Sequence, residues 1–467
     1  MFRIVVARDL NRGIGYKNKL PWNISEEMKY FTDLTTNVNK QEKQNCVIMG
    51  RNTYLSIPEK FRPLKNRINI VLSSTMNKTE GIEVFDDIDK ILNYVEKNKK
   101  KIERCYVIGG ELVYRTFLER DLISEIYETL IHNSFSNVDK YFPKYEDNFK
   151  IYKTKTLTYE DKNSKKLFPV SFRQFKIINQ SENKYLDLMH KILLNGIEKI
   201  DRTGVGTHSL FGESLKYDIS DGKLPLLTTK FVPIRFIIEE LLWFISGSTD
   251  ARKLQEKKIP IWNGNTTREF LDNRGLNHLP EGDIGAGYGH QLRHFNASYT
   301  TCEDSYEGKG FDQLKYVIDL LRHNPESRRI LFSYWNPQQL NDATLPPCHL
   351  VYQFYVNPRT KEISSCLYQR SSDYFLANNY NAVSAIILTH MLGQICGYKP
   401  KEFTHFMGDT HIYKNHFEQC ETQLKRNPYV QPRIKLNKNI TEIENFRYED
   451  FKIINYYPQT AIRGKMN

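Results

Sequence analysis

Short apolar or β-branched runs alternate with amphipathic stretches in the first 177 residues of the chain. Apolar residues recur at helical spacing in Ser25–Thr35 and Asp87–Glu96. Strands that alternate with helices predict an α/β domain with a largely parallel sheet. Turn residues bound the apolar runs that we expect to be buried strands, which are Ile4–Ala7, Cys46–Met49, Ile68–Leu72 and Tyr106–Ile108.

The pattern changes after a polar stretch, Asn179–Asn183. We interpret residues 178–183 as a short linker between a first domain, 1–177, and a second domain, 184–467. A new helical pattern starts at Tyr185. The second domain mixes apolar helices with strands, which predicts an α+β fold. We expect helices over Ile234–Phe244 and Val383–Cys396, and strands over Ile330–Trp335, His349–Val356 and Glu362–Gln369.

Composition excludes several classes of protein. Apolar residues make up 40% and charged residues 26% of the chain, which argues against intrinsic disorder. We expect no membrane span, because no run reaches about 18 apolar residues, and the N-terminal residues lack the apolar core of a signal peptide. The seven cysteines include no Cys-x-x-Cys pair, which argues against a zinc module or a disulfide framework. We therefore expect a cytoplasmic protein without a metal.

The net charge of +12 fits either nucleic-acid binding or small anionic substrates. The densest basic run, Lys97–Lys101, follows a helical pattern, and we interpret it as a solvated helix end. No basic motif interleaved with aromatic residues occurs in the sequence. We therefore expect no dedicated nucleic-acid partner.

Motifs in the first half occur in a characteristic order. They are Gly13–Gly15, Asn18–Trp22, the acid Glu27, Ile48–Thr53, Arg67–Ser73 and Val107–Gly110. This ordered set resembles the dihydrofolate reductase family. The resemblance implies an α/β reductase that takes a hydride from NADPH, protonates dihydrofolate and needs an anionic partner for the pterin.

The resemblance implies that Glu27 holds the pterin and supports its protonation through water, while Thr129 assists. Ser25 would cap the helix that carries Glu27. We interpret the neighbouring Glu26 as a solvated acid. Arg67 would pair with the carboxylate of the folate glutamate. The other residues implied to line the folate pocket, each of which could by type be ordinary core, are Val5, Val6, Leu20, Trp22 and Phe31.

Cofactor binding is implied for the glycine pair Gly109-Gly110, which would let the backbone approach the NADPH pyrophosphate. The helix that starts near Glu111 would add its dipole. A plain tight turn is the alternative for the glycine pair alone. The residues implied to bind the cofactor are Ala7, Ile14, Gly15, Gly50, Arg51, Asn52, Thr53, Leu72, Ser73, Ser74, Val107, Gly109, Gly110, Glu111 and Leu112.

Cys348 is the candidate nucleophile of the second half. Two prolines precede it and a predicted strand follows. A turn at Asn357–Thr360 would set Cys348 opposite Gln369 and next to Arg370. A lone cysteine is more often a small buried hydrophobe. A guanidinium beside the thiol favours the thiolate, and this setting supports a nucleophile.

The motifs around Cys348 resemble the thymidylate synthase family. They are Asp201–Thr207, Glu240–Phe244, Ser327–Arg329, Pro347–His349, Gln369–Asp373 and Gly408–Tyr413. A reductase followed by a synthase is similar to the bifunctional dihydrofolate reductase–thymidylate synthase family of protozoa and plants. The resemblance implies that Cys348 adds to C6 of dUMP, so that C5 can attack 5,10-methylenetetrahydrofolate.

The resemblance also implies a homodimer formed through the synthase domain. Arg328 and Arg329 would reach the dUMP phosphate bound by the other subunit. Asn381 would read the uracil edge, while His411 and Tyr413 would hold the ribose. The residues implied to bind dUMP are Arg202, Arg328, Arg329, His349, Gln369, Arg370, Ser371, Asp373, Asn381, His411 and Tyr413.

Glu240 lies among apolar residues of a predicted helix, so burial is expected to raise its pKa. That suits a group that moves protons through water during methylene transfer. We interpret the neighbouring Glu239 as a more exposed structural acid. Trp262 and Asp373 are implied to lie on the folate side of the site, although core packing is an alternative for Trp262.

Several positions depart from the synthase pattern. Ala377 stands where glycine is typical, Leu292 replaces a tryptophan, and Arg463–Asn467 replaces a small apolar tail. Three alternatives stay open at this point: a pyrimidine hydroxymethylase, against which Asn381 argues, a nucleic-acid-binding protein, and a chain in which one half is an inactive scaffold.

Overall fold

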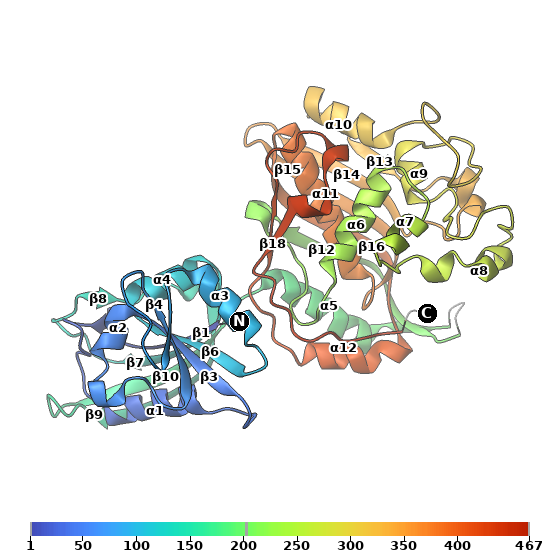
Figure 1. The fold of residues 1–467 in the computed structure, drawn as a ribbon. Coiled ribbons are helices and arrows are strands. Elements are labelled where there is room, and N and C mark those ends of the chain that lie inside the picture. The colour runs from blue at the N-terminus through green and yellow to red at the C-terminus, as the bar shows by residue number, and fades with distance from the viewer. Residues whose placement is uncertain (1, 201–203, 466–467) are drawn as a thin grey trace. The chain divides into compact units, whose positions relative to one another are not determined.

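The computed structural model of the protein forms two compact units, Met1–Ile178 (unit 1) and Asn179–Asn467 (unit 2) (Figure 1). It describes residues 2–200 and 204–465. Helix α5 (Gln180–Asn195) begins directly after the boundary, and the side chain of Asn179 caps it by accepting the backbone N–H of Glu182 (3.1 Å). The linker expected over residues 178–183 is therefore wrong in its second part, because these polar residues start a helix.

Unit 1 is built on a sheet of strand order β5-β4-β3-β6-β1-β7-β10-β9. Neighbouring strands from β5 to β7 are parallel, whereas β10 and β9 run antiparallel to the strands beside them. The expected largely parallel sheet is thus confirmed. The strands are β1 (Phe2–Arg8), β3 (Gln44–Gly50), β4 (Arg67–Leu72), β5 (Ile82–Phe85), β6 (Ile102–Gly109), β7 (Ile123–Ile131), β9 (Phe149–Glu160) and β10 (Leu167–Ile177).

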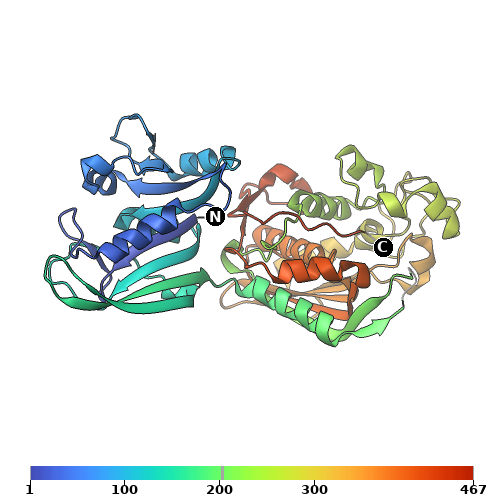
Figure 2. The same ribbon diagram turned by 90° about the horizontal axis from the view of Figure 1, so that it is seen from below.

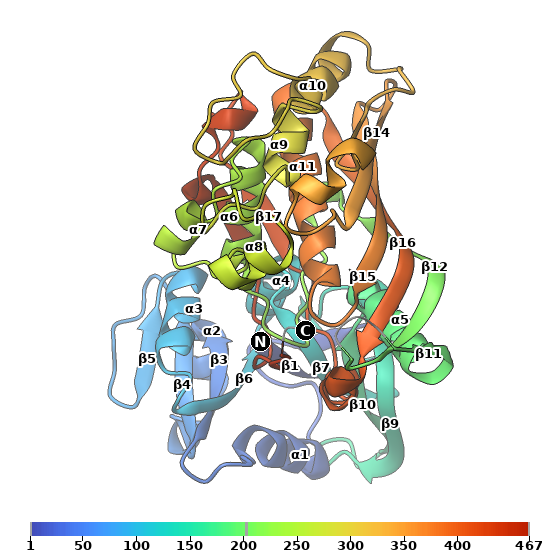
Figure 3. The same ribbon diagram turned by 90° about the vertical axis from the view of Figure 1, so that its right-hand side faces the viewer.

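Helices fill the connections between these strands. Helix α1 lies on one face of the sheet (Figures 1 and 2), and α3 and α4 lie on the opposite face (Figures 1 and 3). Ile24 occupies the N-cap position of α1, so the cap expected from Ser25 is wrong, and Ser25 is the first helical residue. The helices are α1 (Ser25–Thr36), α2 (Arg51–Ser56), α3 (Ile88–Lys97) and α4 (Glu111–Glu119), and a small strand pair is formed by β2 (Gly13–Gly15) and β8 (Lys140–Tyr141).

Unit 2 is built on a sheet of strand order β11-β12-β16-β15-β14-β13. Strands β15 and β16 are parallel, and the other neighbours are antiparallel. The strands are β11 (Ile197–Lys199), β12 (Thr207–Asp218), β13 (Leu331–Ser333), β14 (His349–Asn357), β15 (Glu362–Asp373) and β16 (Lys399–Tyr413), with a separate pair of β17 (Arg433–Leu436) and β18 (Phe451–Ile454). Besides α5, the helices are α6 (Ile234–Ile245), α7 (Arg252–Glu256), α8 (Arg268–Asn273), α9 (Tyr288–Arg293), α10 (Gln313–His323), α11 (Asn378–Cys396) and α12 (Phe417–Leu424).

The two faces of the unit 2 sheet differ in what covers them. Helix α11 packs against one face, where Leu367 and Phe403 are fully buried (Figure 3). The other face presents Tyr355, Tyr368 and Phe406 with exposed fractions of 68%, 43% and 44%. Tyr368 and Phe406 are direct neighbours on β15 and β16. A large apolar patch left open on a sheet is typical of an interaction surface.

The hairpin that carries the candidate nucleophile is longer at its turn than expected. Strand β14 ends at Asn357 and β15 starts at Glu362, and Lys361 adopts a left-handed backbone (φ 51°). His349 rather than Cys348 is therefore the residue opposite Gln369. The expected register is wrong by one residue at this point, although the backbone N–H of Arg370 still donates to the Cys348 carbonyl (3.0 Å).

None of the seven cysteines, all of which lie within the described residues, forms a disulfide bond. Within residues 2–200 and 204–465, none of the helices has the length and apolar character that a membrane span requires.

Glu128 ties three strands of unit 1 together. Its fully buried carboxylate on β7 accepts hydrogen bonds from Arg8 on β1 and from Arg173 on β10. The Tyr145 hydroxyl donates a further hydrogen bond (2.6 Å). Removing one member of a buried ionic cluster leaves the other charges uncompensated, so the stability of unit 1 depends on each member of this cluster.

Replacing Glu128 with alanine should lower the free energy of unfolding of unit 1 by about 3–5 kcal/mol, because the buried Arg8 would lose its nearest carboxylate and keep only the more distant, half-exposed Glu146 (4.0 Å). Hydrogen exchange of β1 and β7 peptides across a urea series measures this region alone. The control is Asp86→Ala, which breaks only an exposed pair with Lys90 and should leave the exchange unchanged. Wild-type exchange in Glu128→Ala would contradict the stabilising role of the cluster.

Candidate active sites

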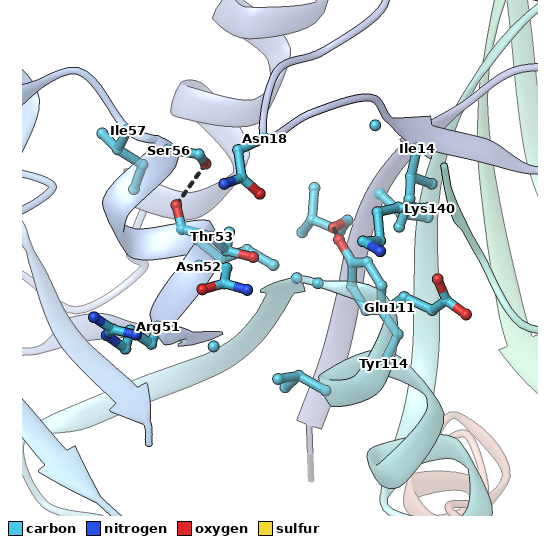
Figure 4. Close-up of a pocket in the computed structure, with 18 of the residues that line it drawn as sticks. Ile14, Asn18, Arg51, Asn52, Thr53, Ser56, Ile57, Glu111, Tyr114 and Lys140 are labelled. Carbon is cyan, nitrogen blue, oxygen red and sulfur yellow. Dashed lines mark hydrogen bonds between the residues drawn. The ribbon is translucent and has the colours of Figure 1, made fainter. Parts of the chain in front are cut away.

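A cleft of about 1570 Å³ opens in unit 1, and most of the residues expected to bind folate or the cofactor line it. Figure 4 shows Arg51, Asn52 and Thr53 of α2 on one side of the cleft and Tyr114 of α4 on the other. The expected folate residues that line it are Val5, Val6, Leu20, Trp22, Glu27, Phe31 and Arg67. The expected cofactor residues that line it are Ala7, Ile14, Gly15, Gly50, Arg51, Asn52, Thr53, Leu72, Ser73, Ser74, Gly109, Gly110, Glu111 and Leu112.

Two expected residues do not line the cleft. Val107 is fully buried in β6, and its neighbour Ile108, which points to the other face of the strand, lines the cleft instead. Thr129 on β7 is buried and pairs with Ala7 of β1, so it lies one strand away from a lining residue.

Glu27 is the acid at the floor of the cleft. Helix α1 carries it in its first turn, where it has an exposed fraction of 7%. Burial raises the pKa of Glu27 to about 7. Its Oε2 atom has no hydrogen-bond partner among the described residues. A buried acceptor without a partner costs free energy, which a ligand with an N–H donor would recover. The neighbouring Glu26 is exposed, as expected.

Arg67 is the arginine among the expected folate residues that line the cleft. Its guanidinium donates to Thr35 Oγ1 (2.8 Å) and to the Lys65 carbonyl (3.0 Å), and it lies over the Phe31 ring (6.0 Å). These contacts fix the plane of the guanidinium at the rim of the cleft, as bidentate carboxylate binding requires.

The glycine pair is closely packed at the cofactor side. A Cβ atom on Gly109, whose φ is +137°, would lie 3.3 Å from Thr53, and one on Gly110 would lie 3.2 Å from Thr53 Oγ1. Helix α4 starts directly after the pair. The bare backbone and the helix N-terminus form a cradle for a phosphate, so the residues present fit a dinucleotide.

Tyr114 is a lining residue that the sequence interpretation missed. Its buried hydroxyl donates to the Val5 carbonyl (2.8 Å), and burial, with a smaller contribution from Glu27, raises its pKa. The signal was its position one helical turn after Gly110, where an aromatic residue faces the strands rather than solvent.

Cys348 lies directly before β14 in unit 2. Tyr288 Oη accepts its backbone N–H (2.9 Å). Arg370 donates to the carbonyls of Pro346 and Pro347 (2.9 Å each), and its Nη2 lies 4.0 Å from the Cys348 Sγ. The guanidinium is therefore held beside the sulfur by the two prolines, in the neighbourhood that the sequence predicted.

His349 and Gln369 are both buried, and their side chains are hydrogen-bonded to other protein groups. Gln369 has an exposed fraction of 1%, and its amide bonds to the Ser371 carbonyl (2.7 Å) and to His405 (2.8 Å). Burial lowers the pKa of His349 to about 4, and its ring is hydrogen-bonded to Tyr352 and Asn381. The structure thus joins His349 and Asn381, but it places the Gln369 side chain in the core.

Glu240 is the acid of unit 2. The indole N–H of Trp262 donates to its Oε1 (2.9 Å), and burial raises the pKa of Glu240 to about 7. The expected direction is confirmed. Glu239 was expected to be the more exposed of the two, and this is wrong: its exposed fraction is 6%, and Lys257 pairs with it (2.6 Å). The Lys257 ammonium compensates its charge.

The remaining expected dUMP residues lie on β15, β16 and two loops. Asp409 bonds to His411 Nδ1 (3.0 Å), whose ring packs edge-on against Tyr413, and Asp373 opposes His411 across β15 and β16. Ser371 opposes Asp409 on the same strands. Arg328 and Arg329 are exposed, and neither pairs with a carboxylate of the described residues. Arg202 lies outside the described residues.

The departures from the synthase pattern have little structural effect. Ala377 has an ordinary helical backbone (φ −104°, ψ −25°), so this position does not require glycine. The described part of the tail, which ends at Lys465, packs onto the unit: His416 Nε2 bonds to the Lys465 carbonyl (2.8 Å), and a Cβ on Gly464 would lie 2.9 Å from Phe375. Among the described residues, no cluster of histidine, cysteine and acidic side chains could hold a metal ion.

Comparison with known proteins gives a family for each unit. Residues 1–176 match the family model of dihydrofolate reductase, and residues 183–467 match that of thymidylate synthase. Curated relatives named bifunctional dihydrofolate reductase-thymidylate synthase align with the whole chain. The Paramecium tetraurelia relative is 39% identical and aligns over 98% of its own length, and those of Leishmania amazonensis and Zea mays are 38% identical and align over 95% and 96% of theirs.

The raised pKa values of Glu27 and Glu240 can be measured by infrared spectroscopy. The wild-type chain should lose two protonated-carboxyl bands with midpoints near pH 7, and Glu27→Gln and Glu240→Gln should each remove one of them. Glu103→Gln is the matched control, because backbone N–H groups lower the pKa of Glu103. A midpoint near 4.5 for either band would contradict the effect of burial.

Proposed function

The chain belongs to the bifunctional dihydrofolate reductase–thymidylate synthase family, and from that premise we propose which residues carry out each reaction. The enzyme forms dTMP from dUMP and reduces dihydrofolate to tetrahydrofolate. The observation that carries the proposal is that each unit holds its own buried acid, with a pKa near 7, beside the groups its reaction needs.

In unit 1, Glu27 binds the pterin and supports its protonation. The unpartnered Oε2 accepts N–H groups from the pterin edge, which recovers the cost of burying it. A carboxyl with a pKa near 7 exchanges protons at neutral pH, so it can deliver one to the pterin through water. Arg67 binds the carboxylate of the folate glutamate, and Thr129 supports the site from the neighbouring strand.

The other side of the same cleft would hold NADPH, which supplies the hydride when bound. Gly109 and Gly110 let the backbone and the start of α4 contact the pyrophosphate. Arg51 and Thr53 offer a charge and a hydroxyl to phosphate, and Ser73 and Ser74 also line the cleft. Ile14 lies across the cleft from Arg51 and Thr53 (Figure 4), and Ile14 and Gly15 close the site over the reacting ring.

In unit 2, the Cys348 thiolate adds to C6 of dUMP, and the resulting carbanion at C5 attacks the methylene carbon of 5,10-methylenetetrahydrofolate as the bond from that carbon to N10 breaks. Loss of the C5 proton and of the folate N5 leaves an exocyclic methylene. This methylene takes a hydride from the tetrahydrofolate as the Cys348 thiolate leaves C6, which gives dTMP and dihydrofolate. Arg370 stabilises the thiolate, because its guanidinium is fixed next to the sulfur. Asn381, oriented by its bond to His349, reads the uracil edge. His411 and Tyr413 hold the ribose, and Ser371 together with Arg202 and Arg370 binds the phosphate.

Glu240 moves protons during methylene transfer. The Trp262 indole N–H orients one carboxyl oxygen, which leaves the other to bond to water. A pKa near 7 lets the group both give and accept protons at neutral pH. Trp262 and Asp373 flank the folate side of this site.

The enzyme is a homodimer formed through the exposed face of the unit 2 sheet. Tyr355, Tyr368 and Phe406 supply apolar area that a second copy would bury. Arg328 and Arg329 are exposed without a carboxylate partner among the described residues, and they bind the dUMP phosphate held by the partner subunit. The seven cysteines, none of which forms a disulfide bond, support a cytoplasmic location.

A substitution in the site of one unit should impair the reaction of that unit and leave the reaction of the other unit unchanged. Cys348→Ala should reduce dTMP formation by about 10³-fold or more and leave dihydrofolate reduction unchanged. Glu27→Gln should reduce dihydrofolate reduction by about 10²–10⁴-fold and leave dTMP formation unchanged. Spectrophotometric assays of each reaction on the same preparation measure both. Glu26→Gln is the matched control and should resemble the wild type, whereas equal loss in Glu26→Gln would contradict the role of Glu27.

Sharing of the phosphate site between subunits can be tested by mixing two inactive variants. Cys348→Ala and the double variant Arg328→Ala/Arg329→Ala, once co-refolded, should recover about a quarter of wild-type dTMP formation, since half of the dimers are mixed and each has one complete site. Mixing Cys348→Ala with Glu240→Gln is the control and should recover nothing, because both residues belong to the same subunit's site. No recovery in the first mixture would contradict a shared site.

A further inference from the structure

The segment between β1 and α1 contributes to the reductase cleft at two places. Ile14 and Gly15 line the cleft near the start of this segment, and Leu20 and Trp22 line it near the end. The segment contains few regular elements of its own, with only the short strand β2 before α1 among its described residues. Its position therefore depends on contacts with other parts of unit 1.

Asp9 provides such contacts although it does not line the cleft. It is fully buried, and its two carboxylate oxygens bind different parts of the chain. Oδ1 accepts the backbone N–H groups of Asn11 (2.9 Å) and Gly13 (2.6 Å), which closes the turn after β1. Oδ2 accepts the backbone N–H of Phe135 (3.0 Å), which lies after β7.

The first oxygen fixes the strand that carries Ile14 and Gly15. A Cβ atom on Gly13 would lie 3.0 Å from Asp9 Oδ1 and 2.8 Å from Val138 Cγ1. Gly13 is thus held between the Asp9 carboxylate and Val138. The two residues that follow Gly13 enter the wall of the cleft.

The second oxygen fixes a residue that packs on Trp22. The ring centroids of Phe135 and Trp22 are 5.5 Å apart with an interplanar angle of 45°. Trp22 has an exposed fraction of 2%, and the two rings belong to one apolar cluster. A shift of the Phe135 backbone would therefore move the surface against which Trp22 rests.

We propose that Asp9 is a positioning residue for dihydrofolate reduction, acting on Ile14 and Gly15 through Gly13 and on Trp22 through Phe135. The carboxylate is suited to this because it offers acceptors on two sides at once, whereas an amide offers one. The proposal rests on the function proposed above for the cleft.

Asp9→Asn separates the two contacts. The asparagine carbonyl can still accept from Asn11 and Gly13, but its NH₂ group faces the Phe135 N–H and cannot accept it. We expect kcat for dihydrofolate reduction to fall by about tenfold or more, with KM for NADPH nearly unchanged, because the reacting groups are misplaced rather than unbound. With NADPH deuterated at the transferred hydrogen, the isotope effect on kcat should rise. The dTMP-forming reaction of the same chain should be unchanged.

Two further variants keep the test specific. Glu103→Gln is the matched control: Glu103 also accepts backbone N–H groups, from Asn39 and Lys40 of unit 1, but lies outside the cleft. It should show wild-type kcat and isotope effect. Phe135→Leu keeps the backbone N–H and removes the ring against Trp22, so it should lower kcat, and combining it with Asp9→Asn should cost less than the product of the two single effects.

The outcomes separate this inference from the proposed function. A wild-type kcat and isotope effect in Asp9→Asn would overturn the inference. A reduction of kcat in the double variant equal to the product of the two single reductions would overturn the route through Phe135. If Asp9→Asn does not fold, Phe135→Leu tests the inference by itself. A kcat equal to that of the wild type in Phe135→Leu would then overturn the route through Phe135. A wild-type chain that does not reduce dihydrofolate would overturn the proposed function instead.

Discussion

Both reactions of this enzyme depend on a carboxylic acid that the fold keeps buried without a cationic partner. Burial raises the pKa of Glu27 and of Glu240 to about 7. No lysine or arginine of the described residues pairs with either group. Between pH 4.5 and 7 the folded chain binds more protons at these groups than the unfolded chain does, so their contribution to stability is greatest below pH 4.5 and is lost as the pH rises through 7. The sites are thus less stable at the pH at which the acids can exchange protons.

The two units have different folds, but in each of them burial raises the pKa of an acid. In unit 1 the first turn of α1 brings Glu27 against a parallel sheet, and the acid keeps one oxygen without a partner for the ligand. In unit 2 the apolar helix α6 carries Glu240, and Trp262 occupies one of its oxygens. Glu239, the neighbour of Glu240 on α6, is instead compensated by the Lys257 ammonium. Other buried acids, such as Asp9 and Glu182, are compensated by hydrogen bonds from N–H and hydroxyl donors. Two adjacent acids on one helix therefore differ in whether a cation compensates them.

Much of the fold and most of the reductase site could be predicted from local sequence signals. Strands such as β1 and β3 are apolar runs, and the glycine pair at 109–110 stands at the end of β6. Features that depend on distant contacts could not be predicted. Val107 lies on the buried side of β6, and Glu239 is buried although it pairs with Lys257. The turn after Asn357 is two residues longer than expected, and an irregularity between His349 and Val351 leaves the register beside Cys348 shifted by one residue. The long strand β16 is mostly polar in sequence, and it forms because β12 and β15 pair with it on both sides.

The most direct test of the account is a turnover measurement on the purified chain with dUMP and 5,10-methylenetetrahydrofolate, followed by addition of NADPH. Quantifying dTMP and the oxidation state of the folate reports on both sites in one preparation. The account predicts that dTMP and dihydrofolate accumulate together and that dihydrofolate disappears once NADPH is present. Failure to form dTMP, or dihydrofolate that persists after NADPH is added, would contradict it.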